Sequence, residues 1–266
     1  MSFWLPFLVS LTSGLYTSLW GAFKDSPFEG MKRRTFPRSV YFHAVIFCAL
    51  YWLPAFAEDF RQLSLFQVFF ATMGLERFLA ELYKGFFRSE DQSKYAVPSR
   101  ITFFGRPVTS EPLRLFSGVV LVSAVFSLLF LSVRIVDFAV FAAVAFSTGM
   151  LVSLGGAYKD APFEGFAPLK FFRSATVLAV CSPLFYYSND PLSPAPLGYL
   201  IFMNGGLERF LVEYYKTYVQ RTMSGKFRPD LPRIIRSIET RERYHYMAWI
   251  IIAGLMVLYV YELTTL

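Results

Sequence analysis

The sequence contains little cysteine, little histidine and few recognisable catalytic motifs, and each scarcity excludes a class of protein. Its two cysteines, Cys48 and Cys181, both lie in apolar stretches, which excludes a disulfide framework and a cysteine-based metal site. Its two histidines, His43 and His245, have no cysteine or acidic neighbour at a ligand spacing, so we expect both to be structural. A nucleophile triad, a zinc-binding HExxH, a Walker loop and a dinucleotide fingerprint are all missing. The sequence therefore predicts no bound cofactor and identifies no catalytic residue.

Charge is also scarce, and its scarcity indicates a membrane protein. Charged residues make up 17% of the chain, against about 25% in an ordinary soluble domain. The apolar residues gather in blocks of about 17–22 residues, long enough to cross a hydrocarbon core of about 30 Å. A backbone inside a bilayer has to satisfy its own hydrogen bonds, so each block is predicted to be a helix. The blocks are 3–22, 39–57, 63–83, 115–133, 138–157, 172–188, 195–212 and 246–263. The sequence thus predicts an all-α, polytopic membrane protein of about eight transmembrane helices.

The basic residues are distributed unequally between the predicted loops. All but four of the 26 Lys and Arg residues lie in the segments that follow the first, third, fifth and seventh blocks. Positively charged loops tend to stay in the cytoplasm, so both termini of this multi-pass protein are predicted on the non-cytoplasmic side. The basic face should attract anionic lipid headgroups, which explains the net charge of +7 without any nucleic-acid partner.

Two sequence motifs occur twice in the chain. Residues 21–30 (GAFKDSPFEG) and 156–165 (GAYKDAPFEG) match at eight of ten positions, and residues 74–84 (GLERFLAELYK) and 206–216 (GLERFLVEYYK) match at nine of eleven. The order and nearly equal spacing of the matches predict a duplicated chain, with one four-helix repeat in 1–134 and another in 135–266. Four crossings return a chain to its starting side, so the repeats should run parallel, related by a pseudo-twofold axis along the membrane normal.

The first motif has the features of a helix start at the cytoplasmic membrane surface. Residues 26–29 (SPFE) fit a capping box, and in the second copy, which lacks the serine, Asp160 would have to act as the cap. The motif either only fixes the angle of a short interfacial helix or uses its free N–H groups, with Lys24 or Lys159, to bind an anion. Its carboxylates could alternatively hold a divalent cation that bridges to a phosphate.

The second motif places charged residues inside the predicted third and seventh helices. Arg77, Glu81 and Lys84 fall on one helical face, their counterparts repeat the pattern, and an intrahelical ladder of ion pairs can explain them. Glu76 and Glu208 are turned away from this face and have no charged residue four positions on. Ionised groups within a membrane cost several kcal/mol unless they are paired or hydrated, so these two glutamates need a partner from another element.

Glu76 and Glu208 are therefore the sharpest site candidates. We expect one of four roles for them. They could clamp a helix to the first loop of each repeat, become protonated, bind a cation, or face a water-filled cavity. The cations expected at the same depth relative to the membrane are Lys24, Arg38, Lys159 and Arg173. The full set of substrate-binding candidates is Lys24, Asp25, Glu29, Arg38, Glu76, Arg77, Glu81, Lys159, Asp160, Glu164, Arg173, Glu208, Arg209 and Glu213.

Three classes of function remain open. A transporter, channel or lipid flippase, with a pseudo-twofold site near the cytoplasmic leaflet, is favoured because both halves keep the charged residues and related halves can move around a shared site. Its substrate would be an anionic, phosphate-bearing molecule, a cation held by the motif carboxylates, another small ion or a lipid. One alternative is a metal-dependent membrane enzyme acting on phospholipid or polyprenyl-phosphate headgroups, in which Asp25, Glu29 and Glu76 hold the metal while Lys24 and Arg77 hold phosphate. The other is an accessory or scaffold subunit.

The arrangement of the motifs in space should separate transport from enzymatic chemistry. Two charge clusters that meet around a polar cavity would favour transport. One cluster open to the cytoplasmic leaflet and one buried and ion-paired would favour an enzyme.

Overall fold

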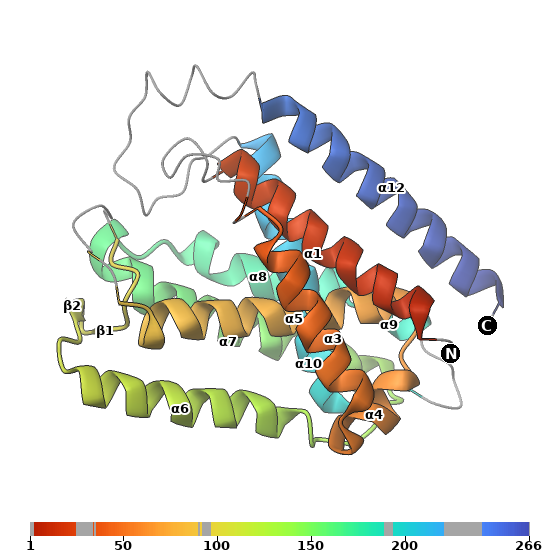
Figure 1. Cartoon of the computed structure of the whole chain (residues 1–266), viewed down its shortest axis with the longest axis horizontal. Helices are drawn as coiled ribbons and strands as arrows, with labels where there is room; N and C mark the ends of the chain where they lie inside the picture. The colour runs from red at the N-terminus through yellow and green to blue at the C-terminus, as the bar shows by residue number, and fades with distance from the viewer. Residues whose placement is uncertain are drawn as a thin grey trace.

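The computed structural model of the chain describes residues 3–24, 34, 36–89, 91, 97–188, 194–220 and 241–265, and these are mostly helical (Figure 1). The α-helices are α1 (Trp4–Lys24), α3 (Arg38–Trp52), α4 (Pro54–Arg61), α5 (Leu65–Leu82), α6 (Glu111–Leu128), α7 (Phe138–Glu164), α8 (Pro168–Cys181), α9 (Pro183–Tyr187), α10 (Leu197–Tyr214) and α12 (Glu242–Thr265). Single π-helical turns, η1 (Tyr83–Phe87) and η2 (Tyr215–Val219), extend α5 and α10. In the described residues the strands are β1 (Thr102–Phe103) and β2 (Arg106–Pro107), a short antiparallel pair. The predicted all-α class is confirmed.

Each of the eight predicted apolar blocks is helical, but two of them are broken. The block 39–57 divides into α3 and α4, which make an angle of 97°. Leu53 is extended at this break, as expected for a residue that precedes a proline. The block 172–188 divides into α8 and α9, and α9 likewise begins with a proline, Pro183. Proline supplies no N–H to the preceding turn, so it favours the start of a new helix.

Three of the described helices are long and apolar enough to cross a membrane, namely α6, α7 and α12. The bent pair of α3 and α4 would make a fourth span. Helices α5 and α10 each contain three charged residues, and α8 has 14 residues, so length and composition alone do not mark them as spans. Many large apolar side chains are exposed, including Leu169 at 91% and Ile250 at 72%. A soluble monomer rarely exposes so much apolar surface, and the structure is consistent with a membrane protein.

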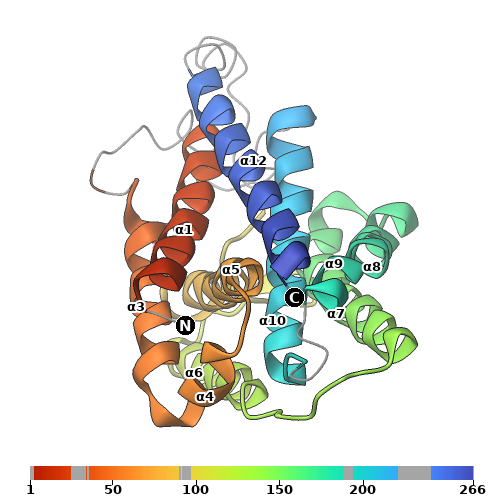
Figure 2. The same ribbon diagram turned by 90° about the vertical axis from the view of Figure 1, so that its right-hand side faces the viewer.

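The helices cross one another rather than forming one parallel bundle. In Figure 1, α1, α3 and α12 slope together from upper left to lower right, while α5 and α6 lie across them. Figure 2 shows α5 along its axis, with α10 passing beside it. The start of α1 and the end of α12 lie on the same side of the molecule in Figure 1.

The centre of the fold is the crossing of α5 and α10, where two glycines let the backbones touch. A Cβ built on Gly74 would lie 1.9 Å from the carbonyl oxygen of Phe202, and one on Gly206 would lie 2.1 Å from that of Phe70. The two contacts are reciprocal in sequence, because Phe202 and Gly206 follow Phe70 and Gly74 by the same number of residues. Small residues at such a crossing allow helices to approach closely.

A second reciprocal pair of glycines brings the first helix of each half against the next one. Gly14 of α1 lies against the backbone of Ser39 in α3, and Gly149 of α7 lies against the backbone of Ser174 in α8. These close approaches determine where the two serine hydroxyls lie relative to α5 and α10.

The second copy of the first motif does not start a helix. Helix α7 continues through Asp160 and Pro162 and ends at Glu164, and the next residue, Gly165, has a φ of 81° and a ψ of 161°, a backbone conformation that favours glycine. The prediction that Asp160 caps a new helix is therefore wrong, because the preceding helix extends past it and α8 begins only at Pro168. In the first copy, residues 21–24 end α1, while residues 25–30, which include Asp25 and Glu29, lie outside the described residues.

Candidate functional site

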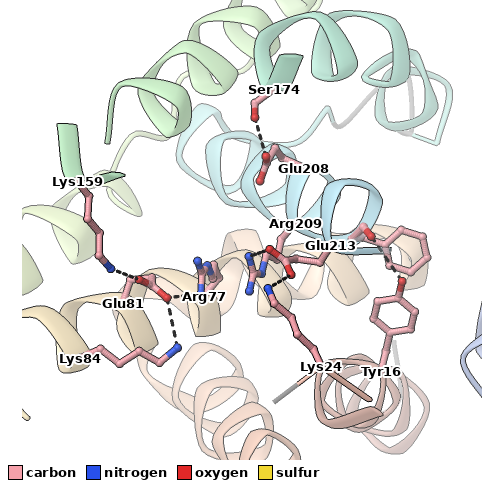
Figure 3. A network of polar contacts seen from close by, with 11 residues as sticks. Tyr16, Lys24, Arg77, Glu81, Lys84, Lys159, Ser174, Glu208, Arg209 and Glu213 are labelled. Atoms are coloured by element: carbon pink, nitrogen blue, oxygen red, sulfur yellow. Dashed lines mark hydrogen bonds and ion pairs between the residues drawn. The ribbon is translucent and has the colours of Figure 1, made fainter. Parts of the chain in front are cut away.

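Charged side chains from four helices meet near the crossing of α5 and α10 (Figure 3). They come from the ends of α1 and α7 and from the charged motifs of α5 and α10. We call them the charge cluster, which comprises Lys24, Arg77, Glu81, Lys84, Lys159, Arg209 and Glu213.

Glu81 is the centre of the α5 side of the cluster. Its carboxylate pairs with Arg77 one turn earlier and lies 3.3 Å from the ammonium group of Lys84. The predicted intrahelical ladder is therefore confirmed on α5. A further contact comes from the other half of the chain, since the ammonium group of Lys159 on α7 lies 3.4 Å from Glu81.

Glu213 has the corresponding position on α10. It pairs with Arg209 of the same helix, and the ammonium group of Lys24 on α1 lies 2.9 Å from it. Each glutamate is thus bound by a lysine from the opposite half of the chain. These ion pairs between the halves were not predicted from the sequence, where both lysines were expected to pair with Glu76 and Glu208.

The two sides of the cluster differ in how deeply they are buried. The side chains of Glu213 and Arg209 are 4% and 15% exposed, whereas those of Glu81 and Arg77 are 27% and 29% exposed. Trp20 causes part of this difference, because the guanidinium carbon of Arg209 lies 4.0 Å from the centroid of its ring.

The residue that corresponds to Trp20 in the second half is Gly155. It precedes Lys159 by four residues, as Trp20 precedes Lys24. A Cβ built on Gly155 would meet nothing within 4 Å. The Arg209 side of the cluster is therefore covered by an indole ring, and the Arg77 side has open space at the matching position. Aligning the two halves over this stretch would have revealed the difference from sequence.

Glu76 and Glu208 each accept a hydrogen bond from a serine on a neighbouring helix. The hydroxyl of Ser39 on α3 lies 3.4 Å from Glu76, and that of Ser174 on α8 lies 2.7 Å from Glu208. The expectation of a partner from another element is confirmed. Among the described residues, however, no ion pair reaches either carboxylate. The expected partnership with Lys24 or Lys159 is wrong, since these lysines extend to Glu213 and Glu81 instead.

The remaining predicted site residues lie at the edge of the cluster or outside it. Arg38 and Glu164 are exposed at the ends of α3 and α7, while Asp160 and Arg173 are partly buried. His43 is fully buried, with its Nδ1 2.8 Å from the carbonyl oxygen of Ser39, which fits the predicted structural role.

Cations outnumber carboxylates in the charge cluster, and this composition suits an anion. In the part of the chain that the structure describes, no group of three or more His, Cys, Asp or Glu side chains is arranged to hold a metal ion. By contrast, three cations, Arg77, Lys84 and Lys159, surround the one carboxylate of Glu81. Guanidinium and ammonium groups are the usual protein donors to phosphate oxygens. Comparison of the chain with protein-family models, with curated proteins and with solved structures finds no match to any of them.

Proposed function

We propose that the protein is an integral membrane transporter that binds an anionic, phosphate-bearing substrate at the charge cluster. The observation that carries this proposal is the exchange of ion pairs between the halves, Lys24 with Glu213 and Lys159 with Glu81. An anion that competes with the two carboxylates for these lysines would loosen the contacts that hold the halves together. Substrate binding would in this way be coupled to a relative movement of the halves.

The proposed architecture has about eight membrane-crossing helices in two parallel repeats, related by a pseudo-twofold axis near the contact of Gly74 with Gly206. The reciprocal glycine contacts support such an axis. The start of α1 and the end of α12 lie on one side, which supports an even number of crossings in the chain as a whole (Figure 1). In this arrangement α5 and α10 cross the membrane with their charges directed at each other, which is how intramembrane ions avoid lipid.

The excess of cations on the Arg77 side gives the site its preference for anions. An incoming phosphate would bind Arg77 and Lys159, and Glu81 would retain Lys84 as a partner. Charge-assisted hydrogen bonds to phosphate are shorter and stronger than neutral ones, so they can compete with an ion pair that is already partly exposed to water.

One observation favours a membrane enzyme as a second candidate, and it is part of the arrangement expected of an enzyme from the sequence. The two sides of the cluster are unequal, because Glu213 is 4% exposed and Glu81 is 27% exposed. An enzyme that keeps its chemistry in one half would show this pattern. The transporter leaves its substrate chemically unchanged, so analysis of the substrate after turnover separates the two functions.

The test uses purified protein and defined phosphate compounds. Inorganic phosphate and glycerol 3-phosphate should raise the thermal unfolding temperature of the wild type, because a ligand that binds only the native state stabilises it. In phosphatidylcholine vesicles, the protein should accelerate the transmembrane movement of radiolabelled glycerol 3-phosphate or of fluorescent phosphatidic acid. Arg77→Gln should abolish both effects, while Arg106→Gln, at an exposed position of β2, should abolish neither.

Two results would contradict the transport proposal. If neither compound crossed the membrane faster than in protein-free vesicles, the protein would not be a transporter of this class. If the phosphate compound were recovered chemically altered, the enzyme candidate would replace it.

A further inference from the structure

The first helix of each half has the same sequence pattern but a different environment. Residues 14–24 (GLYTSLWGAFK) of α1 align with residues 149–159 (GMLVSLGGAYK) of α7. On α1 the aligned face is covered, since Tyr16 is 1% exposed and Leu19 is 0% exposed. On α7 the corresponding residues, Leu151 and Leu154, are 66% and 52% exposed.

Tyr16 is covered in part by Phe210 of α10, whose ring stacks on it with centroids 4.5 Å apart, and the last helix of each half also lies in a different place. Helix α12 ends the second half and packs along α1 of the first half, as Figures 1 and 2 show. Helix α6 ends the first half but packs against η1 and α5. The face of α7 that corresponds to the covered face of α1 is therefore left open beside Gly155.

This open apolar face leads directly into the charge cluster. Leu151, Gly155 and Lys159 are spaced four residues apart, so they lie above one another on one side of α7. Four residues of helix rise about 6 Å, so the open space at Gly155 lies one turn from the lysine that contacts Glu81. A ligand placed here would have its charge at Lys159 and Arg77 and its apolar part on Leu151 and Leu154.

We propose that the Arg77 side of the charge cluster binds the phosphate of an anionic phospholipid, with an acyl chain lying along the exposed face of α7. This inference rests on the proposed function for the position of the site and specifies the class of its substrate. The basic cluster at one end and the apolar surface leading away from it match the two parts of such a lipid. On the other side, Trp20 and α12 occupy the corresponding space, so each chain binds one lipid.

The test compares two ligands that share a phosphate monoester but differ in acyl chains. Binding of dioleoylphosphatidic acid and of glycerol 3-phosphate to the purified full-length protein is measured by native mass spectrometry, with dioleoylphosphatidylcholine as the zwitterionic control. Phosphatidic acid should bind at least about tenfold more tightly than glycerol 3-phosphate, and more tightly than phosphatidylcholine.

Variants at Gly155 test where the acyl chain lies. Gly155→Trp introduces the indole that Trp20 provides on the other side, and should weaken phosphatidic acid binding by about tenfold or more. Gly155→Leu makes the same test with a smaller side chain. The matched control is Gly254→Trp in α12, another glycine whose added Cβ would meet nothing within 4 Å, and it should leave binding unchanged. The thermal unfolding temperature of each variant is measured alongside binding.

The outcomes distinguish a failure of this inference from a failure of the proposed function. Equal binding of glycerol 3-phosphate and phosphatidic acid would show that the site binds soluble anions. The lipid-binding inference would then be wrong, and the proposed transport of a phosphate-bearing anion would stand. The Gly155→Trp and Gly155→Leu variants could fold and keep full phosphatidic acid binding while Arg77→Gln loses it. That result would contradict the placement of the acyl chain on α7. If wild type bound neither phosphate compound, both proposals would fall.

Discussion

Gly74 and Gly206 lie against each other where α5 crosses α10. A Cβ built on Gly74 would be 2.9 Å from the backbone nitrogen of Gly206, and one on Gly206 would be 3.0 Å from that of Gly74. Arg77 and Arg209 each follow their glycine by three residues, so they project from the same faces of the two helices just beyond this contact. The crossing therefore brings the two halves of the charge cluster together.

We expect Gly74→Ala and Gly206→Ala each to lower the stability of the protein by about 2–3 kcal/mol, because the new methyl group would overlap a backbone carbonyl that has no room to move. Thermal unfolding in detergent, followed by circular dichroism, measures the effect. Gly254→Ala is the control, since its methyl group would meet nothing within 4 Å. An alanine at position 74 or 206 that left stability unchanged would show that the two helices do not cross so closely.

The two exchanged ion pairs should contribute unequally to stability. Lys24→Met should cost about 3 kcal/mol, because it leaves the carboxylate of Glu213, which is 4% exposed, with one fewer partner. Lys159→Met should cost no more than about 1 kcal/mol, because Glu81 is 27% exposed and keeps Arg77 and Lys84. Thermal unfolding of both variants gives the comparison.

A double-mutant cycle between Lys24→Met and Glu213→Gln isolates the energy of that pair from other effects of the substitutions. A coupling energy near zero would contradict an ion pair between α1 and α10.

The helices and the ladders within them could be predicted from the sequence because both depend on residues close together in the chain. The eight apolar blocks are long enough to be recognised without knowing their neighbours. The pairing of Arg77 with Glu81 follows from the helical repeat alone.

The contacts between helices could not be predicted, because they depend on which helices pack together. Lys24 and Glu213 are 189 residues apart, and their pairing requires the end of α1 to lie beside α10. The same limitation explains the wrong cap at Asp160, since the local order of residues does not show that α7 continues past it. The covered and open sides of the cluster depend on Trp20 and Gly155, which differ between otherwise similar stretches.

Replacing Ser174 should destabilise the protein more than replacing Ser39, because Ser174 makes the shorter hydrogen bond. Ser174→Ala removes a 2.7 Å hydrogen bond to the buried carboxylate of Glu208 and should cost about 2 kcal/mol. Ser39→Ala removes a longer contact of 3.4 Å to Glu76 and should cost less than about 1 kcal/mol. Their unfolding temperatures, measured side by side, test this order. The opposite order would mean that the two carboxylates are not held as the structure shows.

Glu76→Gln and Glu208→Gln should each slow the movement of the phosphate compound in vesicles by about tenfold or more, while the folded protein remains in the membrane. The reason is that an amide keeps the size of the side chain and its hydrogen bond to serine but loses the charge beside Arg77 or Arg209. The flux assay is paired with thermal unfolding of the same samples. Full activity in both variants would exclude these carboxylates from the transport site, and loss of folding would make them a structural clamp.

Glu262, near the end of α12, should stabilise the start of α5. Its carboxylate accepts a 2.6 Å hydrogen bond from the backbone N–H of Leu65 and a 3.3 Å bond from that of Phe66, at the positive end of the helix dipole. Glu262→Gln keeps an acceptor oxygen but loses the charge, and should cost about 1 kcal/mol. Glu262→Met leaves buried N–H groups without that acceptor, and should cost about 2–3 kcal/mol.

The control for Glu262 is Thr264→Val, at an exposed position whose hydroxyl donates to the backbone carbonyl of Tyr261 in its own helix. Thermal unfolding ranks the three variants. Because α12 packs along α1, losing this anchor should loosen the contact between these two helices. Hydrogen exchange in α1 should therefore rise in Glu262→Met and stay unchanged in Thr264→Val. Equal exchange in the two variants would show that the carboxylate does not hold α12 in place.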